Sequence, residues 1–248
     1  LDLSLAIVQF TCIQPMRGVR MIAELQDMVE ASFPAFADAN LIRGIAEGVA
    51  LADQLRASDP ILSGAVGRDL AGHLRRAGVI ARIKALCDRG ELPFEASIDL
   101  MPIGNWHHLV LRASDTLVSH LCRTESALAF PKDTPNRQDE RLTNQPDLFD
   151  ENVISLSAAL KVVEEKCVWL TYGFTSEGDL THACWAMPSP PNVAETWYAH
   201  INVVERLRRS GQAIKSPPKG VDPNEVLKFK RDIDEALRRT DSNRETEE

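Results

Sequence analysis

Residues 167–187 read Cys-Val-Trp-Leu-Thr-Tyr-Gly-Phe-Thr-Ser-Glu-Gly-Asp-Leu-Thr-His-Ala-Cys-Trp-Ala-Met, and this stretch decides the class of fold that the sequence predicts. Its two halves, 167–174 and 180–187, are rich in aromatic and β-branched residues, which favour strands. The residues between them, Ser176-Glu177-Gly178-Asp179, are typical of a tight turn. We therefore expect an antiparallel β-hairpin.

A first group of strands is expected upstream of this hairpin. The runs Phe94–Leu100, Trp106–Leu111 and Thr116–Cys122 are short and strand-like. Ser114-Asp115, just before the third run, is a turn signal. The chain is therefore expected to contain two hairpin regions that are separated by about forty residues.

The first ninety residues have the periodicity of helices instead. Apolar residues recur at intervals of three and four within 21–29, 41–55 and 61–89. Asp38 has the residue type of an N-cap before the second segment, and Gly90 suits the C-terminal end of the third. Glycines within the third segment leave open whether it forms one helix or two shorter ones.

The remaining segments complete an α+β prediction. Val153–Val163 is expected to form a short helix, Ala194–Arg209 fits either a strand or a helix, and Asp222-Pro223 begins a last amphipathic helix. The fold class is α+β, with a helical N-terminal part, antiparallel β-hairpins and a C-terminal helix. The predicted regions are a helical N-terminal region (1–92), a first β-hairpin region (93–130), an exposed linker (131–150), a second β-hairpin region (151–215) and a C-terminal helix with a polar tail (216–248).

Composition excludes several classes of protein. Hydrophobic residues make up 44% and charged residues 26% of the 248, which argues against wholesale disorder. A formal charge of −8 argues against coating nucleic acid by bulk electrostatics. Five cysteines without a CxxC spacing indicate reduced thiols and a cytoplasmic location. The apolar opening, Leu1–Ile13, is too short to span a bilayer, and we expect no contact with membranes.

The linker contains two adjacent large apolar residues in an otherwise polar stretch. The pentapeptide Gln145-Pro146-Asp147-Leu148-Phe149 places Leu148 and Phe149 where a shallow apolar pocket on a partner could accept them. Gln145 offers a donor and an acceptor at the other end, and Pro146 favours an extended shape. The alternative is that Leu148 and Phe149 attach this segment to the protein's own core.

This pentapeptide resembles the motif by which bacterial proteins bind the DNA polymerase sliding clamp: Gln, any residue, Ser or Asp, Leu, Phe. The resemblance covers five residues, and the chain is similar in kind to clamp-targeting bacterial toxins. It implies that Gln145, Asp147, Leu148 and Phe149 bind the clamp and that binding perturbs DNA replication. As the toxin of a toxin–antitoxin pair, the chain would have an antitoxin or degradation adaptor as a further partner. The alternative is a clamp-tethered DNA-processing enzyme such as a nuclease.

A cluster of basic residues is the candidate for direct contact with nucleic acid. Arg75, Arg76, Arg82 and Lys84 lie in one predicted helical stretch with few acidic residues around them. Such a local positive surface is suited to phosphate groups. A solvated helix face explains the same residues without a ligand.

Two short repeats suggest a metal site. Ser119-His120-Leu121-Cys122 and Thr181-His182-Ala183-Cys184 each place a histidine and a cysteine on one face of a predicted strand. Two histidines and two cysteines could bind zinc, whereas the plainer interpretation is a pair of strands with buried cysteines. Since the spacing is unlike common zinc signatures, we assign no metal.

Enzymatic motifs are weak. His107-His108 beside Trp106 and the sequence Glu164-Glu165-Lys166 each resemble parts of catalytic sites. Adjacent histidines on a strand point to opposite faces, and a nuclease needs a further carboxylate. The sequence contains no phosphate-binding glycine loop, dinucleotide fingerprint or nucleophile elbow. We therefore assign no catalytic residue and no cofactor.

Overall fold

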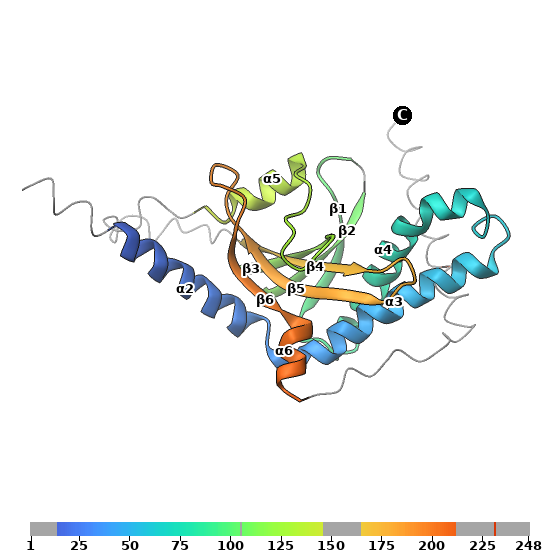
Figure 1. Cartoon of the computed structure of the whole chain (residues 1–248), viewed down its shortest axis with the longest axis horizontal. Coiled ribbons are helices and arrows are strands. Elements are labelled where there is room, and N and C mark those ends of the chain that lie inside the picture. Colours follow the sequence, from blue (N-terminus) through green and yellow to red (C-terminus); the bar gives the residue numbers. More distant parts are fainter. Residues whose placement is uncertain (1–13, 105, 146–164, 212–230, 232–248) are drawn as a thin grey trace, which may run out of the picture.

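The computed structural model describes residues 14–104, 106–145, 165–211 and 231, and Figure 1 shows the arrangement of their helices and strands. The elements in chain order are α2 (Gln14–Ser32), the short turn η1 (Ala35–Ala37), α3 (Asp38–Ser58), α4 (Ala65–Asp88), β1 (Glu95–Leu100), β2 (His107–Ser114), β3 (Leu117–Arg123), α5 (Pro135–Leu142), β4 (Lys166–Phe174), β5 (Leu180–Pro188), β6 (Trp197–Asn202) and α6 (Val203–Arg209). Helices at the N-terminal side and a mixed sheet confirm the predicted α+β class.

The described strands form a six-stranded sheet in the order β1-β2-β3-β4-β5-β6. Neighbouring strands are antiparallel except β3 and β4, which are parallel. The sheet therefore consists of two three-stranded antiparallel meanders placed side by side. A parallel pair needs a crossover connection, and residues 124–165 with α5 supply it.

The predicted hairpin is formed by β4 and β5. Trp169 lies opposite Ala186, and Tyr172 lies opposite Ala183. At the turn, the main-chain N–H of Thr175 donates to the carbonyl of Asp179. Gly178 has a φ of +95°, a conformation that a side chain would strain, so the glycine is required by the turn.

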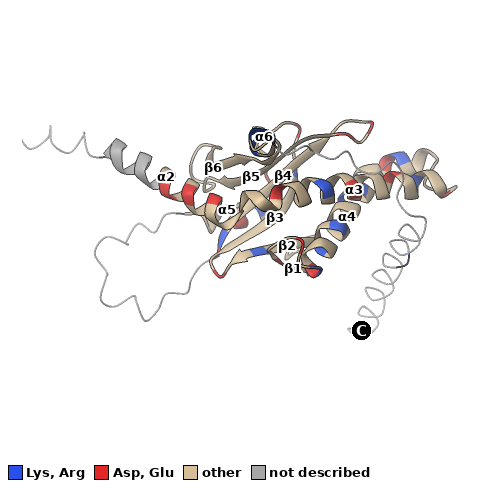
Figure 2. Ribbon diagram, turned by 90° about the horizontal axis from the view of Figure 1, so that it is seen from below, with Lys and Arg blue, Asp and Glu red and all other residues tan. Residues whose placement is uncertain are grey.

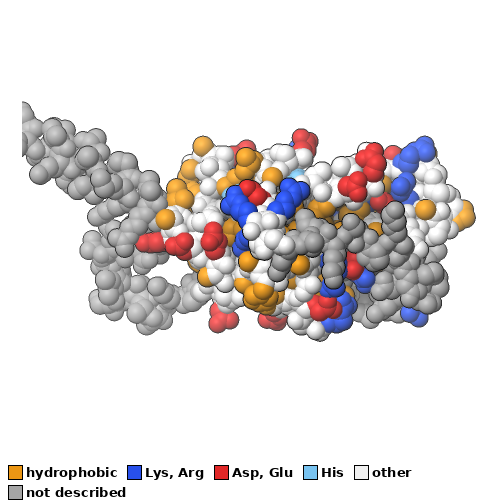
Figure 3. Space-filling model, turned by 60° about the horizontal axis from the view of Figure 1, so that its bottom comes forward, with side chains coloured by type: hydrophobic (Ala, Val, Ile, Leu, Met, Phe, Trp, Pro, Cys, Tyr) orange, Lys and Arg blue, Asp and Glu red, His pale blue; other side chains and the backbone are white. Residues whose placement is uncertain are grey.

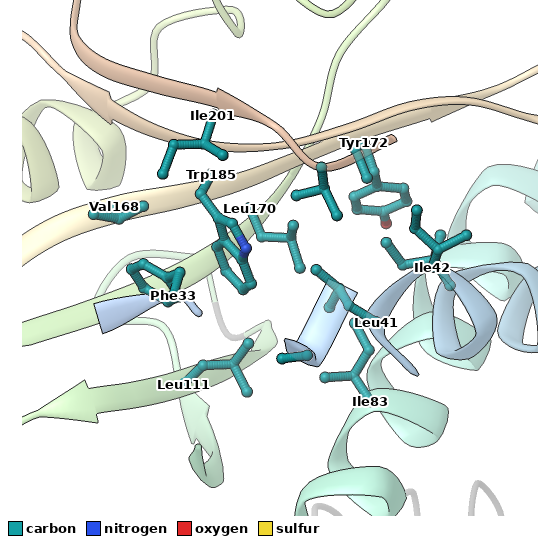
Figure 4. Packing of buried hydrophobic residues seen from close by; sticks show 14 of the residues in the cluster. Phe33, Leu41, Ile42, Ile83, Leu111, Val168, Leu170, Tyr172, Trp185 and Ile201 are labelled. Carbon is teal, nitrogen blue, oxygen red and sulfur yellow. The ribbon is translucent and has the colours of Figure 1, made fainter. Parts of the chain in front are cut away.

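One face of the sheet forms the main core with the helices. Residues on this face alternate along the strands and include Leu111 of β2, Leu170 of β4 and Trp185 of β5. Phe33, just after α2, stacks on Trp185 with ring centroids 4.0 Å apart. Ile83 of α4 reaches the same cluster (Figure 4). This packing fixes the strands relative to the helices.

The opposite face is covered by α5 and the residues before it. In Figure 1, α5 lies on one side of the sheet and α3 and α6 on the other. Cys122, Cys167 and Trp169 form a smaller apolar cluster there, against which Phe130 and Trp197 pack. The range 131–150, expected to be an exposed linker, thus contains a helix that contacts the sheet, and the structure describes this range as far as Gln145.

Residues 194–209, for which the sequence allows a strand or a helix, contain both: β6 comes first and α6 follows. Asp38, expected as an N-cap, is the first residue of α3, and Ala37 occupies the cap position. The helices expected at 153–163 and after Asp222 lie outside the described residues apart from Arg231. Among the helices that the structure describes, none combines the length and apolar character needed to cross a membrane.

Candidate functional site

Asn144 anchors the chain immediately before the pentapeptide that begins at Gln145. Its side-chain amide donates to the carbonyls of Cys167 (2.8 Å) and Pro188 (3.0 Å), and its side-chain oxygen accepts from the N–H of Cys167 (2.8 Å). Asn144 is itself buried. Three hydrogen bonds to two neighbouring strands therefore fix the backbone at this point.

Gln145, the first residue of the pentapeptide, is exposed. Its main chain is still held, because its N–H donates to the carbonyl of Leu142 and its carbonyl accepts from Lys166 Nζ. Its side chain is thus presented to solvent. Pro146, Asp147, Leu148 and Phe149 lie outside the described residues.

α5 precedes Asn144 in the chain, and both local and long-range contacts hold this helix in place. The side chain of Thr134 caps the helix by accepting from the N–H of Arg137, and Pro135 occupies its first turn. Arg141, which is 2% exposed, donates to the carbonyls of Ser189 and Pro190 at 2.8 and 3.0 Å. The apolar periodicity of a helix is missing from this polar segment, so sequence patterns did not predict α5.

Arg75, one of the four basic candidates, is engaged inside the fold. It is 8% exposed, and its Nη2 lies 2.8 Å from Asp53 Oδ2. The same guanidinium donates to the carbonyls of Thr175 and Ser176 and lies over the ring of Phe174. These contacts connect α4 to α3 and to the β4–β5 turn, which gives Arg75 a structural role.

The other three basic candidates also have partners within the chain. Arg82 pairs with Glu47 at 2.9 Å, Lys84 pairs with Asp88 at 2.7 Å, and Arg76 donates to the carbonyl of His107. Lys and Arg are interspersed with Asp and Glu along the α3–α4 pair (Figure 2), and they form separate small groups on the face shown in Figure 3. Nucleic-acid binding by these residues remains a prediction from sequence.

The two His-x-Cys repeats do not meet in one site. Cys122 lies opposite Thr171 of β4, and Thr171 lies opposite Cys184 of β5, so a whole strand separates the two cysteines. His182 Nε2 is 2.8 Å from the hydroxyl of Thr124. Adjacent strands are about 4.8 Å apart, and two such steps are too long for shared coordination. A four-residue zinc site formed by both repeats is therefore excluded.

His120 instead lies beside His108 and Glu140. Each of these three residues offers one ligand atom, and those atoms lie within 4.8 Å of one another. The residues come from β3, β2 and α5, respectively. Glu140 Oε2 accepts a hydrogen bond of 2.6 Å from Trp169 Nε1. We name this set the His108–His120–Glu140 cluster; sequence analysis missed it because no motif links three elements with these spacings.

Burial determines the protonation of this cluster. It lowers the pKa of His120 to about 4, and it is also the main cause that lowers the pKa of His108. Burial raises the pKa of Glu140, against the effect of the Trp169 hydrogen bond. Both imidazoles are therefore neutral near pH 7, which is the form that can bind a metal ion.

The remaining catalytic candidates are dispersed. His107 is exposed, and Trp106 stacks on His73 with ring centroids 5.4 Å apart. Glu165 pairs with Arg112, and Lys166 Nζ donates to the carbonyl of Thr143. Glu164 lies outside the described residues.

Comparisons with protein-family models, with curated proteins and with solved structures found no match to this chain. Function is therefore argued from the residues themselves.

Proposed function

We propose that the chain binds the bacterial DNA polymerase sliding clamp through Gln145–Phe149 and perturbs DNA replication, as the toxin of a toxin–antitoxin pair. One observation carries the proposal: Gln145 is exposed directly after the buried anchor Asn144. A docking peptide must be reachable from solvent, and the exposure of its first residue meets this requirement.

The proposed mechanism is competition for one pocket. Leu148 and Phe149 occupy the apolar pocket of the clamp, Gln145 supplies hydrogen bonds, and Asp147 occupies the Ser or Asp position of the motif. Polymerases and repair factors that need the same pocket are then displaced. A peptide of this size binds with a dissociation constant of roughly 1 μM, or about −8 kcal/mol.

The deciding experiment is a clamp pull-down with the full chain. We expect wild type to be retained, and the double variant Leu148→Ala with Phe149→Ala to lose at least tenfold in affinity. The matched control is Leu142→Ala, since Leu142 is 48% exposed and precedes the pentapeptide by only three residues. Retention of the double variant at wild-type strength contradicts the proposal.

Inhibition of DNA synthesis is tested by an experiment separate from the pull-down. In clamp-dependent DNA synthesis, wild type should slow the reaction, added clamp should restore it, and the double variant should have no effect. Co-purification with a neighbouring gene product would identify an antitoxin or a degradation adaptor. Inhibition that added clamp does not relieve contradicts competition for the pocket.

The second candidate is a clamp-tethered DNA-processing enzyme. The observation that favours it is the His108–His120–Glu140 cluster, because metal-binding residue types of this kind occur in hydrolytic sites. Such an enzyme would cleave naked DNA in the presence of a divalent ion even after Leu148 and Phe149 are replaced. A toxin that only occupies the pocket of the clamp would not cleave DNA under these conditions.

A further inference from the structure

We propose that His108, His120 and Glu140 bind one divalent transition-metal ion, with zinc the best match to this set of ligands. Two imidazoles and one carboxylate are a common zinc set in proteins. The proposed clamp binding does not require this metal site, so each of the two proposals can be tested without the other.

The sheet places both histidines on the same face. Val110 lies opposite His120, and His108 is two residues before Val110, so the histidines are diagonal neighbours on adjacent strands. Their ring centroids are 4.9 Å apart. α5 covers this face and adds Glu140 from above, which brings the three side chains together from three rigid elements.

The histidine nitrogens supply an independent observation. The Nδ1 atoms of His108 and His120 are both buried, and neither has a hydrogen-bond partner among the described residues. A buried polar atom without a partner is destabilising, and native proteins keep few of them. Two such atoms within one cluster of three residues point to a ligand of these histidines.

Glu140 is oriented as a metal ligand would be. Its Oε2 accepts from Trp169 Nε1, which leaves Oε1 for an ion. Ligands in metal sites are usually held by such an outer hydrogen bond, which fixes the direction of the carboxylate. Trp169 is 1% exposed, so this orienting contact is itself rigid.

Charged groups of both signs surround the cluster. Asp99 of β1 lies opposite His108 in the sheet, and its charge acts on both histidines. Two carboxylates, Glu140 and Asp99, match the charge of a divalent ion. Arg112 and Arg76 act in the opposite sense on His120 and His108, respectively.

The geometry fits one ion and predicts an open coordination position. Ligands at about 2.0–2.1 Å from zinc lie roughly 3.3 Å apart, which falls within the 4.8 Å range of the cluster. Three protein ligands leave a fourth position for water or another small ligand, as in catalytic rather than structural zinc sites.

The test is zinc binding by the full chain. After treatment with a chelator, wild type should take up one zinc ion per chain, measured by calorimetry and by metal analysis of the dialysed complex. His108→Ala and Glu140→Gln should each weaken binding at least tenfold. Glu140→Gln keeps an acceptor for Trp169 and nearly the same volume, so it tests the charge without disturbing the packing.

His107→Ala is the matched control, because His107 is the neighbouring residue on β2, is exposed and points to the other face. This variant should bind zinc as wild type does. Cobalt substitution adds a structural readout, since coordination by nitrogen and oxygen gives a spectrum without a thiolate charge-transfer band. Circular dichroism of each metal-free variant verifies the fold.

Three outcomes overturn the proposal. They are zinc uptake well below one ion per chain, equal affinity in wild type and Glu140→Gln, and a cobalt spectrum with a thiolate band. The last would assign the ion to the cysteines instead. None of these results bears on clamp retention, so failure here leaves the docking proposal unaffected.

Discussion

His182 shows how one side chain sets a pH dependence. It is 3% exposed, with Nε2 2.8 Å from Thr124 Oγ1 and Nδ1 2.9 Å from Thr181 Oγ1. Burial, and then the charge of His200, lower its pKa from the ordinary value of 6.5. The folded chain therefore keeps His182 neutral at a pH where the unfolded chain already binds a proton.

The free energy of unfolding should accordingly fall as the pH drops below about 6.5. The reason is that His182 binds a proton in the unfolded state but stays neutral in the folded state. His182→Gln removes this contribution and should reduce the slope by at most about 1.4 kcal/mol per pH unit. Urea unfolding at several pH values between 5 and 7.5 measures the slope. His107→Gln, at an exposed position, should leave it unchanged; an unchanged slope in His182→Gln contradicts the assignment.

At the scale of elements, α3 and α4 approach each other closely at two glycines. A Cβ atom on Gly78 would lie 2.2 Å from the carbonyl oxygen of Gly48, and one on Gly48 would lie 2.6 Å from the carbonyl oxygen of Gly78. Backbone atoms cannot move aside as a flexible side chain can. The contact therefore fixes the spacing of the helix pair against which the sheet packs.

Gly78→Ala should destabilise the protein by about 1–3 kcal/mol, because overpacking outweighs the better helix propensity of alanine. Gly72→Ala, in the same helix, should stabilise it by up to about 1 kcal/mol. A Cβ at Gly72 would meet only Arg123 Nη1, at an ordinary 3.6 Å. Chemical denaturation of both variants measures the difference, and equal effects would show that the close approach is not maintained.

Local patterns predicted the hairpin strands and helices α2 to α4 because their apolar residues repeat with the period of each element. They could not predict α5, which is short and polar and is held by Arg141 and Asn144. The parallel pairing of β3 with β4 and the meeting of His108, His120 and Glu140 depend on long-range contacts. Of the four residues predicted to bind the clamp, the structure describes only Gln145, so their role stays a prediction.

At the scale of the molecule, an ion pair joins two helices that are far apart in the sequence, α3 and α6. Asp38, which is 1% exposed, lies 2.6 Å from Arg206 of α6, and Arg206 also donates to the carbonyl of Phe33. Burial raises the pKa of Asp38, and the Arg206 hydrogen bond opposes that change. The pair connects the N-terminal helices to the last described helix.

Arg206→Ala should cost about 3–5 kcal/mol, because it leaves a buried carboxylate without its partner. Arg209→Ala, in the same helix, should cost less than about 1 kcal/mol, since Arg209 is a largely exposed residue that pairs with Glu205 one turn away. Thermal and urea unfolding of the two variants provide the comparison. Similar losses of unfolding free energy in both variants would show that the buried Asp38–Arg206 pair stabilises the fold no more than an exposed pair does.

The anchor at Asn144 has a consequence for how this protein can evolve. Asn144 bonds to Cys167, so the residues that flank 146–164 are already neighbours. The entropy of closing a loop grows only slowly with its length, which means that insertions and exchanges there disturb the sheet little. The pentapeptide proposed to bind the clamp can thus change in sequence while the described strands keep their pairing. A single backbone cut between Gln145 and Glu165 would leave two fragments joined by the paired strands β3 and β4.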